Sequence, residues 1–278
     1  MWLSTTCSLL PLLVRLSPAL LFLLQLPDYS TTEEGHWQDY KHGLQEKPFC
    51  SWKCLLFTLQ WPAAFCQSLD NETLCRIPPG VDSWTIHGLW PLGAYGCCKC
   101  WPMFQSDVQE LEAELTEHWP SLLRTKSSFH FWREEWEKHG VCAACVEGMN
   151  SPLRYFQICL KLRGQFDIHK LLQDADITPS CDRPYKVEEV QQVLALHLGE
   201  KHVIQCVTDH KDREVWFQVK IPLSHNLTLG CEHHSGANRD PAPRSDPGWH
   251  PSNGHPCPPQ TPFYYFPIDH QEPLRPCG

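Results

Sequence analysis

The chain has 278 residues, of which 42% are hydrophobic and 20% are charged. This balance is typical of one or two folded domains and excludes a largely disordered protein. The formal charge of −9, with histidine neutral, excludes a protein that binds nucleic acid through a permanently basic surface. Protonation of all 16 histidines would add 16 positive charges and turn −9 into +7, so an acidic compartment would reverse the attraction for polyanions.

The N-terminal segment has the features of a secretory signal peptide. Leu9–Leu26 is apolar, but Arg15 interrupts it. A transmembrane anchor is the alternative, and it requires about 20 uninterrupted apolar residues. We therefore favour a signal peptide over residues 1–30, followed by a loose polar leader over residues 31–50. No later stretch of the sequence is long and apolar enough to span a bilayer.

The hydrophobic pattern predicts strands and helices without a βαβ rhythm. Strands are expected over residues 55–61, 83–87, 202–208 and 214–223. Helices are expected over residues 107–115, 128–139, 153–173 (in two pieces, separated near Gly164) and 187–198. Gly88 is expected to turn the chain after the second strand, and Gly140 to end the second helix. The predicted fold class is α+β, with a mainly antiparallel sheet flanked by several helices and stapled by disulfides.

The C-terminal segment differs in composition from the rest. Residues 235–278 contain 11 of the 25 prolines and cannot form a regular domain. The aromatic run Phe263–Phe266 is the exception, because it can dock as a last strand with Cys257 as a staple. We therefore predict one domain over residues 51–234 and a proline-rich extension that is partly docked on it.

The cysteine count indicates an oxidising compartment. Sixteen cysteines in a chain of this length are rare in a cytosol. Removal of the signal peptide leaves 15, so one thiol stays unpaired or links two chains, and the oligomeric state is open. A zinc site is the alternative, with thiolates from Cys97–Cys100 and Cys142–Cys145, but secretion favours disulfides and no metal is predicted. Asn71 and Asn226 begin glycosylation acceptor triplets that the secretory route could use.

Two segments carry a concentration of reactive side chains. The first is residues 84–91, Trp-Thr-Ile-His-Gly-Leu-Trp-Pro, with His87. The second is residues 131–142, in which Glu135, Lys138 and His139 stand at i, i+3 and i+4 and would share one face of a helix. If the strand end that bears His87 faces that helix, the cleft holds two imidazoles beside an ammonium group.

This set of groups suits the transesterification of RNA by its own 2′-hydroxyl. One imidazole removes the 2′ proton while the other protonates the departing 5′ oxygen. A lysine stabilises the charge on the phosphorane-like transition state. The nucleophile is part of the substrate, so no metal or cofactor is needed, and the predicted partner is single-stranded RNA rather than DNA.

Each of these residues has an ordinary structural explanation when taken alone. A single histidine among 16 is more often a surface or satisfied polar residue. Glu135 and Lys138 can form a common helix ion pair that contributes about 0.3–0.5 kcal/mol. The tryptophans are by default core aromatics: Trp84, Trp90, Trp132 and Trp136. The joint occurrence of both segments favours the functional interpretation, because packing does not require it.

The two segments resemble the active-site motifs of the ribonuclease T2 family. Further agreement comes from Leu59-Gln60-Trp61-Pro62 with Cys66, and the similarity covers residues 52–266. The resemblance implies an endoribonuclease that leaves 2′,3′-cyclic phosphate ends. It also implies roles for six residues: His139 as general base, His87 as general acid, Glu135 and Lys138 as transition-state stabilisers, and Trp90 and Phe131 as base-stacking residues.

One position departs from the family pattern. Glu134 stands where many members have a third histidine that contacts phosphate. A carboxylate there would repel the substrate unless it is protonated or drawn aside by Arg133, so we expect reduced turnover. The alternative is a secreted relative that binds RNA or a protein partner without turnover.

The resemblance also implies disulfides and a cellular location. The implied pairs are Cys66 with Cys75, Cys97 with Cys142, and Cys206 with Cys257. Pro222 stands at a family cysteine position, so Cys231 is expected to lack its usual partner. The expected location is the extracellular space or the lysosomal lumen.

Overall fold

The structure is a computed structural model that describes residues 51–69, 74–94, 97–98, 100–231 and 254–277. The predicted signal peptide, the leader and the acceptor Asn71 lie outside these residues, as does much of the proline-rich extension. Those expectations stay predictions.

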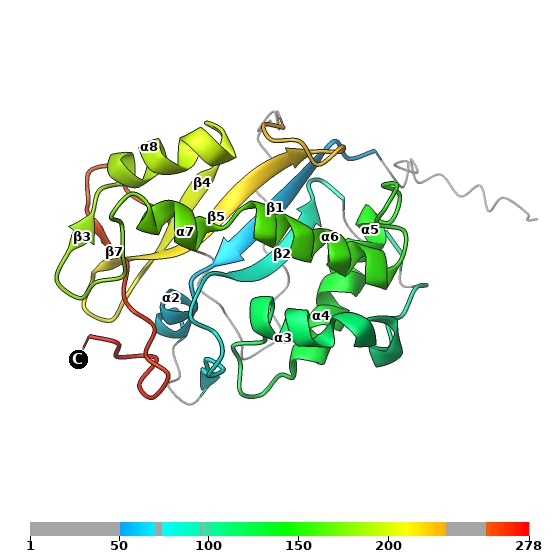
Figure 1. Cartoon of the computed structure of the whole chain (residues 1–278), viewed down its shortest axis with the longest axis horizontal. Helices are drawn as coiled ribbons and strands as arrows, with labels where there is room; N and C mark the ends of the chain where they lie inside the picture. Colours follow the sequence, from blue (N-terminus) through cyan, green and yellow to red (C-terminus); the bar gives the residue numbers. More distant parts are fainter. Residues whose placement is uncertain (1–50, 70–73, 95–96, 99, 232–253, 278) are drawn as a thin grey trace, which may run out of the picture. The chain divides into compact units, whose positions relative to one another are not determined.

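A mixed sheet forms the centre of the described chain (Figure 1). Its main path runs β2-β1-β5-β4-β6, while β7 joins β3 and β5. The pairings are antiparallel except between β5 and β7, which are parallel. The strands are β1 (Cys54–Gln60), β2 (Thr85–Pro91), β3 (Pro184–Tyr185), β4 (Val203–Thr208), β5 (Glu214–Ser224), β6 (His255–Pro256) and β7 (Phe263–Tyr264). The predicted α+β class with a mainly antiparallel sheet is confirmed.

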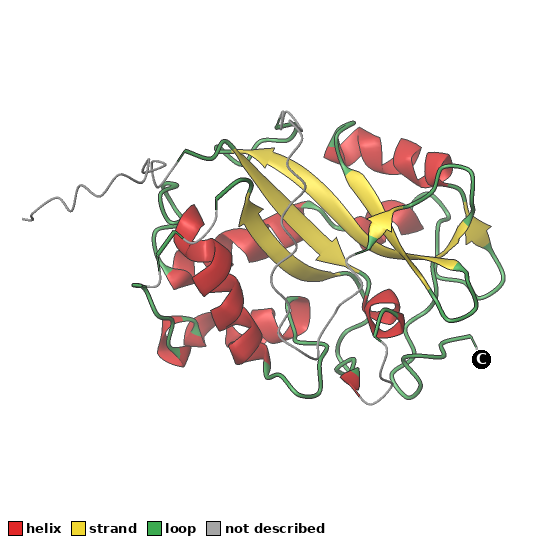
Figure 2. Ribbon diagram, turned by 180° about the vertical axis from the view of Figure 1, so that it is seen from behind, coloured by secondary structure: helices red, strands yellow, loops and turns green. Residues whose placement is uncertain are grey.

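Helices cover one face of this sheet. The longer ones are α3 (Glu112–His118), α4 (Ser128–Glu135), α6 (Pro152–Gln165) and α8 (Val187–Leu198), and α2 (Pro62–Gln67) and α7 (Ile168–Gln173) are shorter. In Figure 1, α6 and α7 lie in front of the strands, and the view from behind in Figure 2 shows the other face of the sheet. Phe57 of β1 packs towards the helices, with its ring 6.3 Å from that of Phe166.

The opposite face of the central strands carries polar side chains. Successive residues of a strand point to opposite faces, so Thr58 and Gln60 alternate with Phe57 and Leu59 on β1. Thr58, Gln60 and the β5 residue Gln218 are each at most 4% exposed. This buried polar face lies next to the β2 strand that carries His87.

Three predicted elements differ from the observed ones. The strand at residue 83 does not turn at Gly88 but continues to Pro91. The helix expected over residues 107–115 is divided into η3 (Gln105–Asp107), η4 (Gln109–Leu111) and α3. The Asp107 carboxylate accepts a hydrogen bond from the Phe104 backbone N–H at 2.8 Å, which closes a tight turn there.

The third difference concerns the helix that carries the motif residues. It does not end at Gly140 but continues from α4 through a π-helical turn, η5 (Trp136–Gly140), into α5 (Val141–Ala143). Gly140 has ordinary helical backbone angles. A Cβ at Gly140 would come closer than 3.0 Å to the Trp136 ring, so the glycine provides space for this ring rather than ending the helix.

Disulfides join segments that are distant in the sequence. The structure pairs Cys66 with Cys75, Cys97 with Cys142, and Cys206 with Cys257, as the resemblance implies. Cys231, whose usual partner position is occupied by Pro222, pairs instead with Cys54. The remaining pairs between described cysteines are Cys98 with Cys100 and Cys181 with Cys277.

These disulfides also bear on the zinc alternative. Its candidate ligands Cys97, Cys98, Cys100, Cys142 and Cys145 are all oxidised in disulfides. Within the described ranges, no three His, Cys, Asp or Glu side chains are grouped so that they could hold a metal ion. Among the described cysteines, the buried Cys159 keeps a free thiol.

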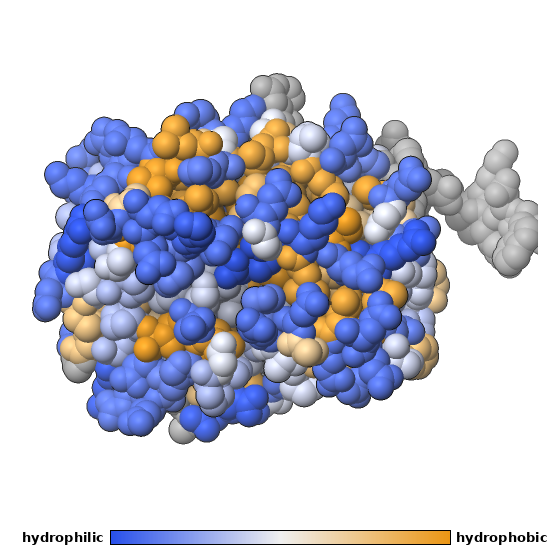
Figure 3. All heavy atoms as spheres, viewed as in Figure 1, coloured by the Kyte–Doolittle hydropathy of each residue, from blue (hydrophilic) through white to orange (hydrophobic). Residues whose placement is uncertain are grey.

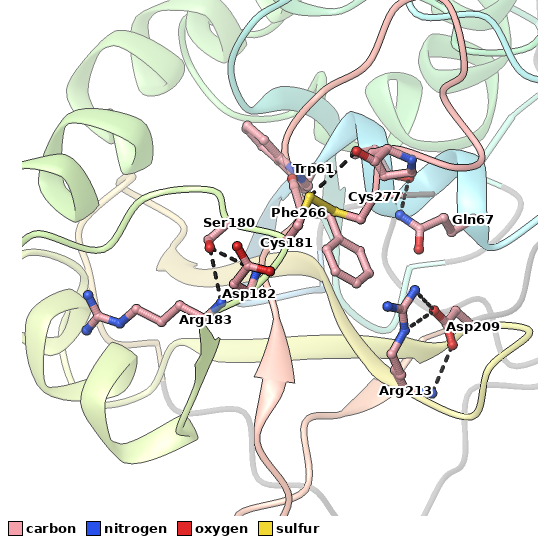
Figure 4. Close-up of a disulfide and its surroundings, with 12 residues drawn as sticks. Trp61, Gln67, Ser180, Cys181, Asp182, Arg183, Asp209, Arg213, Phe266 and Cys277 are labelled. Carbon is pink, nitrogen blue, oxygen red and sulfur yellow. Dashed lines mark hydrogen bonds and ion pairs between the residues drawn. A yellow bond between two sulfur atoms is a disulfide. The ribbon is translucent and has the colours of Figure 1, made fainter.

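The C-terminal segment is fastened back onto the domain (Figure 4). The Trp61 indole donates a hydrogen bond to the Phe266 carbonyl at 2.7 Å. The Ser180 backbone N–H donates to the Tyr265 carbonyl at 2.8 Å, next to the disulfide between Cys181 and Cys277. The aromatic run after residue 262 is therefore part of the core.

The face shown in Figure 3 is largely polar, with apolar areas between the hydrophilic residues. Leu196 of α8 is the most exposed of the large hydrophobic side chains described, at 83%. The described part of the chain contains no helix that is both long enough and apolar enough to cross a bilayer.

Candidate active site

His87 lies at an irregularity of strand β2. Thr58 of β1 pairs with Gly88 and Leu59 pairs with Ile86, so His87 has no partner in the register. An extra residue of this kind, a β-bulge, redirects a side chain and is common beside active sites. The Trp119 indole donates a hydrogen bond to the His87 carbonyl at 3.2 Å and fixes the backbone at this point.

The second group of motif residues lies where α4 becomes the π-helical turn. Ser127 caps α4, since its Oγ accepts a hydrogen bond from the His130 backbone N–H at 3.2 Å. Glu135 is the last residue of α4, and Lys138 and His139 lie in η5. Single π-turns within helices are frequently found at functional sites.

The indole of Trp90 connects the predicted catalytic groups. Its ring lies 5.0 Å from the imidazole of His87 and 5.6 Å from that of His139, between ring centroids. Its Nε1 donates a hydrogen bond to Oε2 of Glu135 at 2.9 Å. The structure therefore brings the two histidines and Glu135 together around one side chain, although the two motifs are far apart in the sequence.

Gly88 makes this close packing possible. A Cβ at Gly88 would come closer than 3.0 Å to both Nε1 of Trp90 and Oε2 of Glu135. The hydrogen bond between these two atoms therefore passes directly over the glycine. The prediction that Gly88 turns the chain is wrong: it lies within β2 and allows the side chains of Trp90 and Glu135 to approach each other.

Burial shifts the acid–base properties of the three groups. It raises the pKa of Glu135 from 4.5 to about 7, although the hydrogen bond from Trp90 acts in the opposite direction. Burial lowers the pKa of His87 from 6.5 to about 3, and the positive charge of Lys220 and the neighbouring His139 add to this effect. Burial, assisted by Lys138, lowers the pKa of His139 to about 4. In the free protein at neutral pH, both imidazoles are therefore neutral.

Glu134 binds cations of its own helix and of the preceding loop. Its carboxylate accepts hydrogen bonds from Nζ of Lys126 at 2.9 Å and from Nζ of Lys138 at 3.0 Å. His130 lies 3.0 Å from it. Burial raises the pKa of Glu134, but these hydrogen bonds outweigh it and bring the pKa to about 2.

Two alternatives that the sequence left open for this helix are not observed. Glu134 is held by Lys126 and Lys138 rather than by Arg133, whose Nε instead lies 4.0 Å from Glu137. Lys138 is bound to Glu134 and not to Glu135, because it stands four residues after Glu134 and lies on its side of the helix.

The aromatic residues of the motifs divide into two groups. Trp84, Trp132 and Trp136 are at most 1% exposed and belong to the core. Trp90 and Phe131 are partly exposed, and the Phe131 ring lies 6.5 Å from that of His87. The two predicted base-stacking residues therefore both lie beside His87.

The structure adds site residues that the motifs do not contain. Gln218 lies with its Nε2 2.8 Å from Nδ1 of His87, and Lys220 acts on the same imidazole through its charge. In the strand expected over residues 214–223, Val215, Phe217, Val219 and Ile221 alternate with other residues, and this alternation places Gln218 and Lys220 on the other side of β5. The sequence does not show the strand register that brings this side of β5 next to His87.

The fold is that of a disulfide-bonded α+β protein in which two histidines and a glutamate lie around one tryptophan. A profile of the ribonuclease T2 family matches residues 52–237. The chain belongs to the ribonuclease T2 family, which is a family of enzymes.

The curated proteins similar to this chain include ribonucleases of human and of Magallana gigas. The chain is 38% identical to human ribonuclease T2 over 165 residues, or 59% of this chain and 62% of the human protein. It is 31% identical to ribonuclease Oy of Magallana gigas over 208 residues, which cover 72% of this chain and 96% of that protein.

Solved structures agree with the fold. The crystal structure of human RNase T2 is similar with a TM-score of 0.58 at 34% identity, covering 64% of this chain and 89% of that one. The structure of RNase NT in complex with 5′-AMP is similar with a TM-score of 0.61 at 25% identity, covering 78% of this chain and 99% of that one.

Proposed function

We propose that this protein is an endoribonuclease that cleaves single-stranded RNA by transesterification and leaves 2′,3′-cyclic phosphate ends. The observation that carries the proposal is the position of two imidazoles and one carboxyl group around Trp90. The names of the human and Magallana relatives, both ribonucleases, and the 5′-AMP bound by RNase NT support a nucleotide substrate.

His139 acts as the general base in this proposal. Its low pKa keeps the imidazole neutral down to about pH 4, so it can accept the proton of the 2′-hydroxyl in an acidic compartment. The oxygen then attacks the neighbouring phosphorus, and Glu135 and Lys138 stabilise the transition state on the side of the π-turn. Trp90 and Phe131 offer aromatic faces for the bases that flank the scissile bond.

His87 acts as the general acid and protonates the departing 5′ oxygen. Burial disfavours the imidazolium in the free protein, but the arriving phosphate is an anion and favours it. The protonated state of His87 is therefore coupled to substrate binding. Neither step requires a cofactor, because the substrate supplies the nucleophile and the two histidines move the protons.

The test uses an end-labelled oligoribonucleotide at about pH 5, with and without a chelator, and mass spectrometry of the products. We expect cyclic-phosphate ends in both cases, and we expect His87→Ala and His139→Ala each to reduce the rate by about 10²–10⁴-fold. The control substrate carries 2′-deoxyribose at the cleaved position and should remain intact. Cleavage of the control, or equal rates for the wild type and both variants, would reject the mechanism.

A second candidate function is RNA or protein binding without turnover. Its support is Glu134, whose carboxylate neutralises Lys138 and Lys126 at the edge of the site. The wild type would then bind the oligoribonucleotide but not cleave it, and Glu134→His would produce a large gain in cleavage. Robust cleavage by the wild type that Glu134→His leaves unchanged would exclude this candidate. Glu137→Gln on the same helix removes an equal charge and serves as the control.

The disulfides between described cysteines support an oxidising compartment. We propose that the protein works outside the cell or in the lysosomal lumen.

A further inference from the structure

The side-chain amide of Gln218 contacts the imidazole of His87. The two residues are 131 positions apart in the sequence, and Nε2 of Gln218 lies 2.8 Å from Nδ1 of His87. Gln218 pairs with Gln60 across β1 and β5, and β1 in turn pairs with the bulged segment of β2. The Gln218 side chain is 4% exposed, so neighbouring strands fix its position.

This contact defines the tautomer of His87. An amide nitrogen can only donate a hydrogen bond, so Nδ1 of His87 accepts and the single ring proton resides on Nε2. The Nε2–H group is then the one left to face the substrate. For a general acid this orientation is the productive one, because the same nitrogen can transfer its proton to the leaving oxygen.

A neutral imidazole is nevertheless not a sufficient acid, and His87 must first take a second proton from solvent at Nδ1. The charged groups that face it include Lys220 of β5 and His139 of η5, which oppose this proton, and Glu135 across Trp90. The N–H of the Gln218 amide would oppose protonation of Nδ1 of His87 as well. If the amide of Gln218 turns over, its carbonyl oxygen accepts the Nδ1–H of the imidazolium instead.

We propose that Gln218 is a positioning residue for His87, which holds the Nε2–H tautomer in the resting protein and accepts the Nδ1 proton of the imidazolium during cleavage. The inference rests on the proposed role of His87 as general acid. In each turnover His87 gains a proton from solvent at Nδ1 and gives its Nε2 proton to the 5′ oxygen, while His139 takes the proton of the 2′-hydroxyl. Solvent exchange then restores both rings.

The chemistry of the amide distinguishes it from its possible replacements. Leucine at position 218 can neither donate nor accept, so it neither selects the tautomer nor stabilises the imidazolium. Glutamate can only accept and adds a negative charge, so it favours the imidazolium. Gln205 lies directly opposite Gln218 on β4, on the same face of the sheet, and provides a matched control position.

The experiment measures the tautomer and pKa of His87 by NMR of protein labelled with ¹⁵N-histidine, with the resonances assigned by their loss in His87→Ala. It also measures kcat/KM against pH on a short RNA. We expect the Nε2–H tautomer in the wild type. Gln218→Glu should raise the pKa of His87 by about 1 pH unit or more and shift the basic limb of kcat/KM by the same amount. Gln218→Leu should lower kcat/KM by about tenfold, whereas Gln205→Leu should not.

Two results would overturn the inference. One is an Nδ1–H tautomer in the wild type at neutral pH, which decides the matter even if a variant fails to fold. The other is a Gln218→Glu protein in which neither the pKa of His87 nor the basic limb of the pH profile of kcat/KM has moved. Failure of the proposed function is recognised separately, because the NMR measurement does not depend on cleavage, and an inactive wild type with the Nε2–H tautomer would contradict only the ribonuclease mechanism.

Discussion

Substitution of Gly88 tests whether the close packing around Trp90 is needed for catalysis. The Cβ of Gly88→Ala would come closer than 3.0 Å to Nε1 of Trp90 and to Oε2 of Glu135, so at least one of these side chains must move. The hydrogen bond between them is 2.9 Å long and Glu135 is 7% exposed. Leaving a buried polar group without its hydrogen-bond partner costs about 1–3 kcal/mol, and about 1.4 kcal/mol corresponds to a factor of ten.

We therefore expect Gly88→Ala to lower kcat/KM by about 10- to 100-fold. Forcing an additional methyl group into a packed site costs about 1–3 kcal/mol of folding free energy. For a domain of this size, each kcal/mol lowers Tm by about 2–4 °C. The assay compares initial rates on a short labelled RNA, well below the Tm of the variant, with thermal unfolding followed by circular dichroism.

Gly80→Ala is the matched control for this substitution. No atom lies within 4 Å of a Cβ at Gly80, and its φ is outside the left-handed region. It should leave both the rate and Tm within error of the wild type. A Gly88→Ala protein with the same Tm and a rate within about threefold of the wild type would refute the argument that Trp90 and Glu135 depend on this glycine.

Three further predictions concern protonation and modification. In the proposed mechanism His87 must carry a proton, and its pKa is about 3 in the free protein, so kcat/KM should fall tenfold per pH unit between about pH 5 and 7; a plateau in this range would contradict the burial of His87. The folded-state pKa of Glu135 is raised from 4.5 to about 7, so its ionisation destabilises the fold increasingly as pH rises through this interval. Glu135→Gln should therefore have a higher Tm than the wild type at pH 7 and lose this advantage near pH 4.5, and an advantage that is independent of pH would show that ionisation is not its cause. Asn226 is exposed in a turn after β5, so protein made in a secretory host should lose mass on treatment with a glycosidase, and Asn226→Gln should remove that loss at this position.

The larger elements could be predicted because their side chains divide between core and solvent. The helix expected over residues 187–198 is observed as α8, and the strand expected over residues 214–223 is observed as β5 with one more residue. In both, the hydrophobic period is set by burial of one face, which the sequence displays directly. The pairing of Cys54 with Cys231 has no such local signal, since 177 residues separate the two and only the fold brings them together.

The sequence singles out His87, Glu135 and His139, which the structure brings together around Trp90, but it does not show their geometry. His87, Glu135 and His139 were identified from the residue types that acid–base chemistry requires. Lys138 stands four residues after Glu134 and three after Glu135, and both separations permit an ion pair on a helix, so the sequence alone does not show that Lys138 pairs with Glu134. The contact between Gln218 and His87 depends on the strand register and on one bulged residue, which hydrophobic periodicity does not specify.

The tryptophans link the core to the chemistry of the site. The Trp132 indole donates a hydrogen bond to the Trp119 carbonyl at 2.7 Å, and the Trp119 indole donates to the His87 carbonyl at 3.2 Å. Trp90 belongs to the same group, because its indole N–H donates a hydrogen bond to the Glu135 carboxyl group. Each indole fills apolar volume and donates one hydrogen bond at its polar edge. The same large rings that exclude water, and thereby shift the pKa values of His87 and Glu135, also fix the positions of these two residues. The positions of His87 and Glu135 and their shifted pKa values therefore have one physical origin, which explains why residues that are core aromatics by default are concentrated in the two motifs.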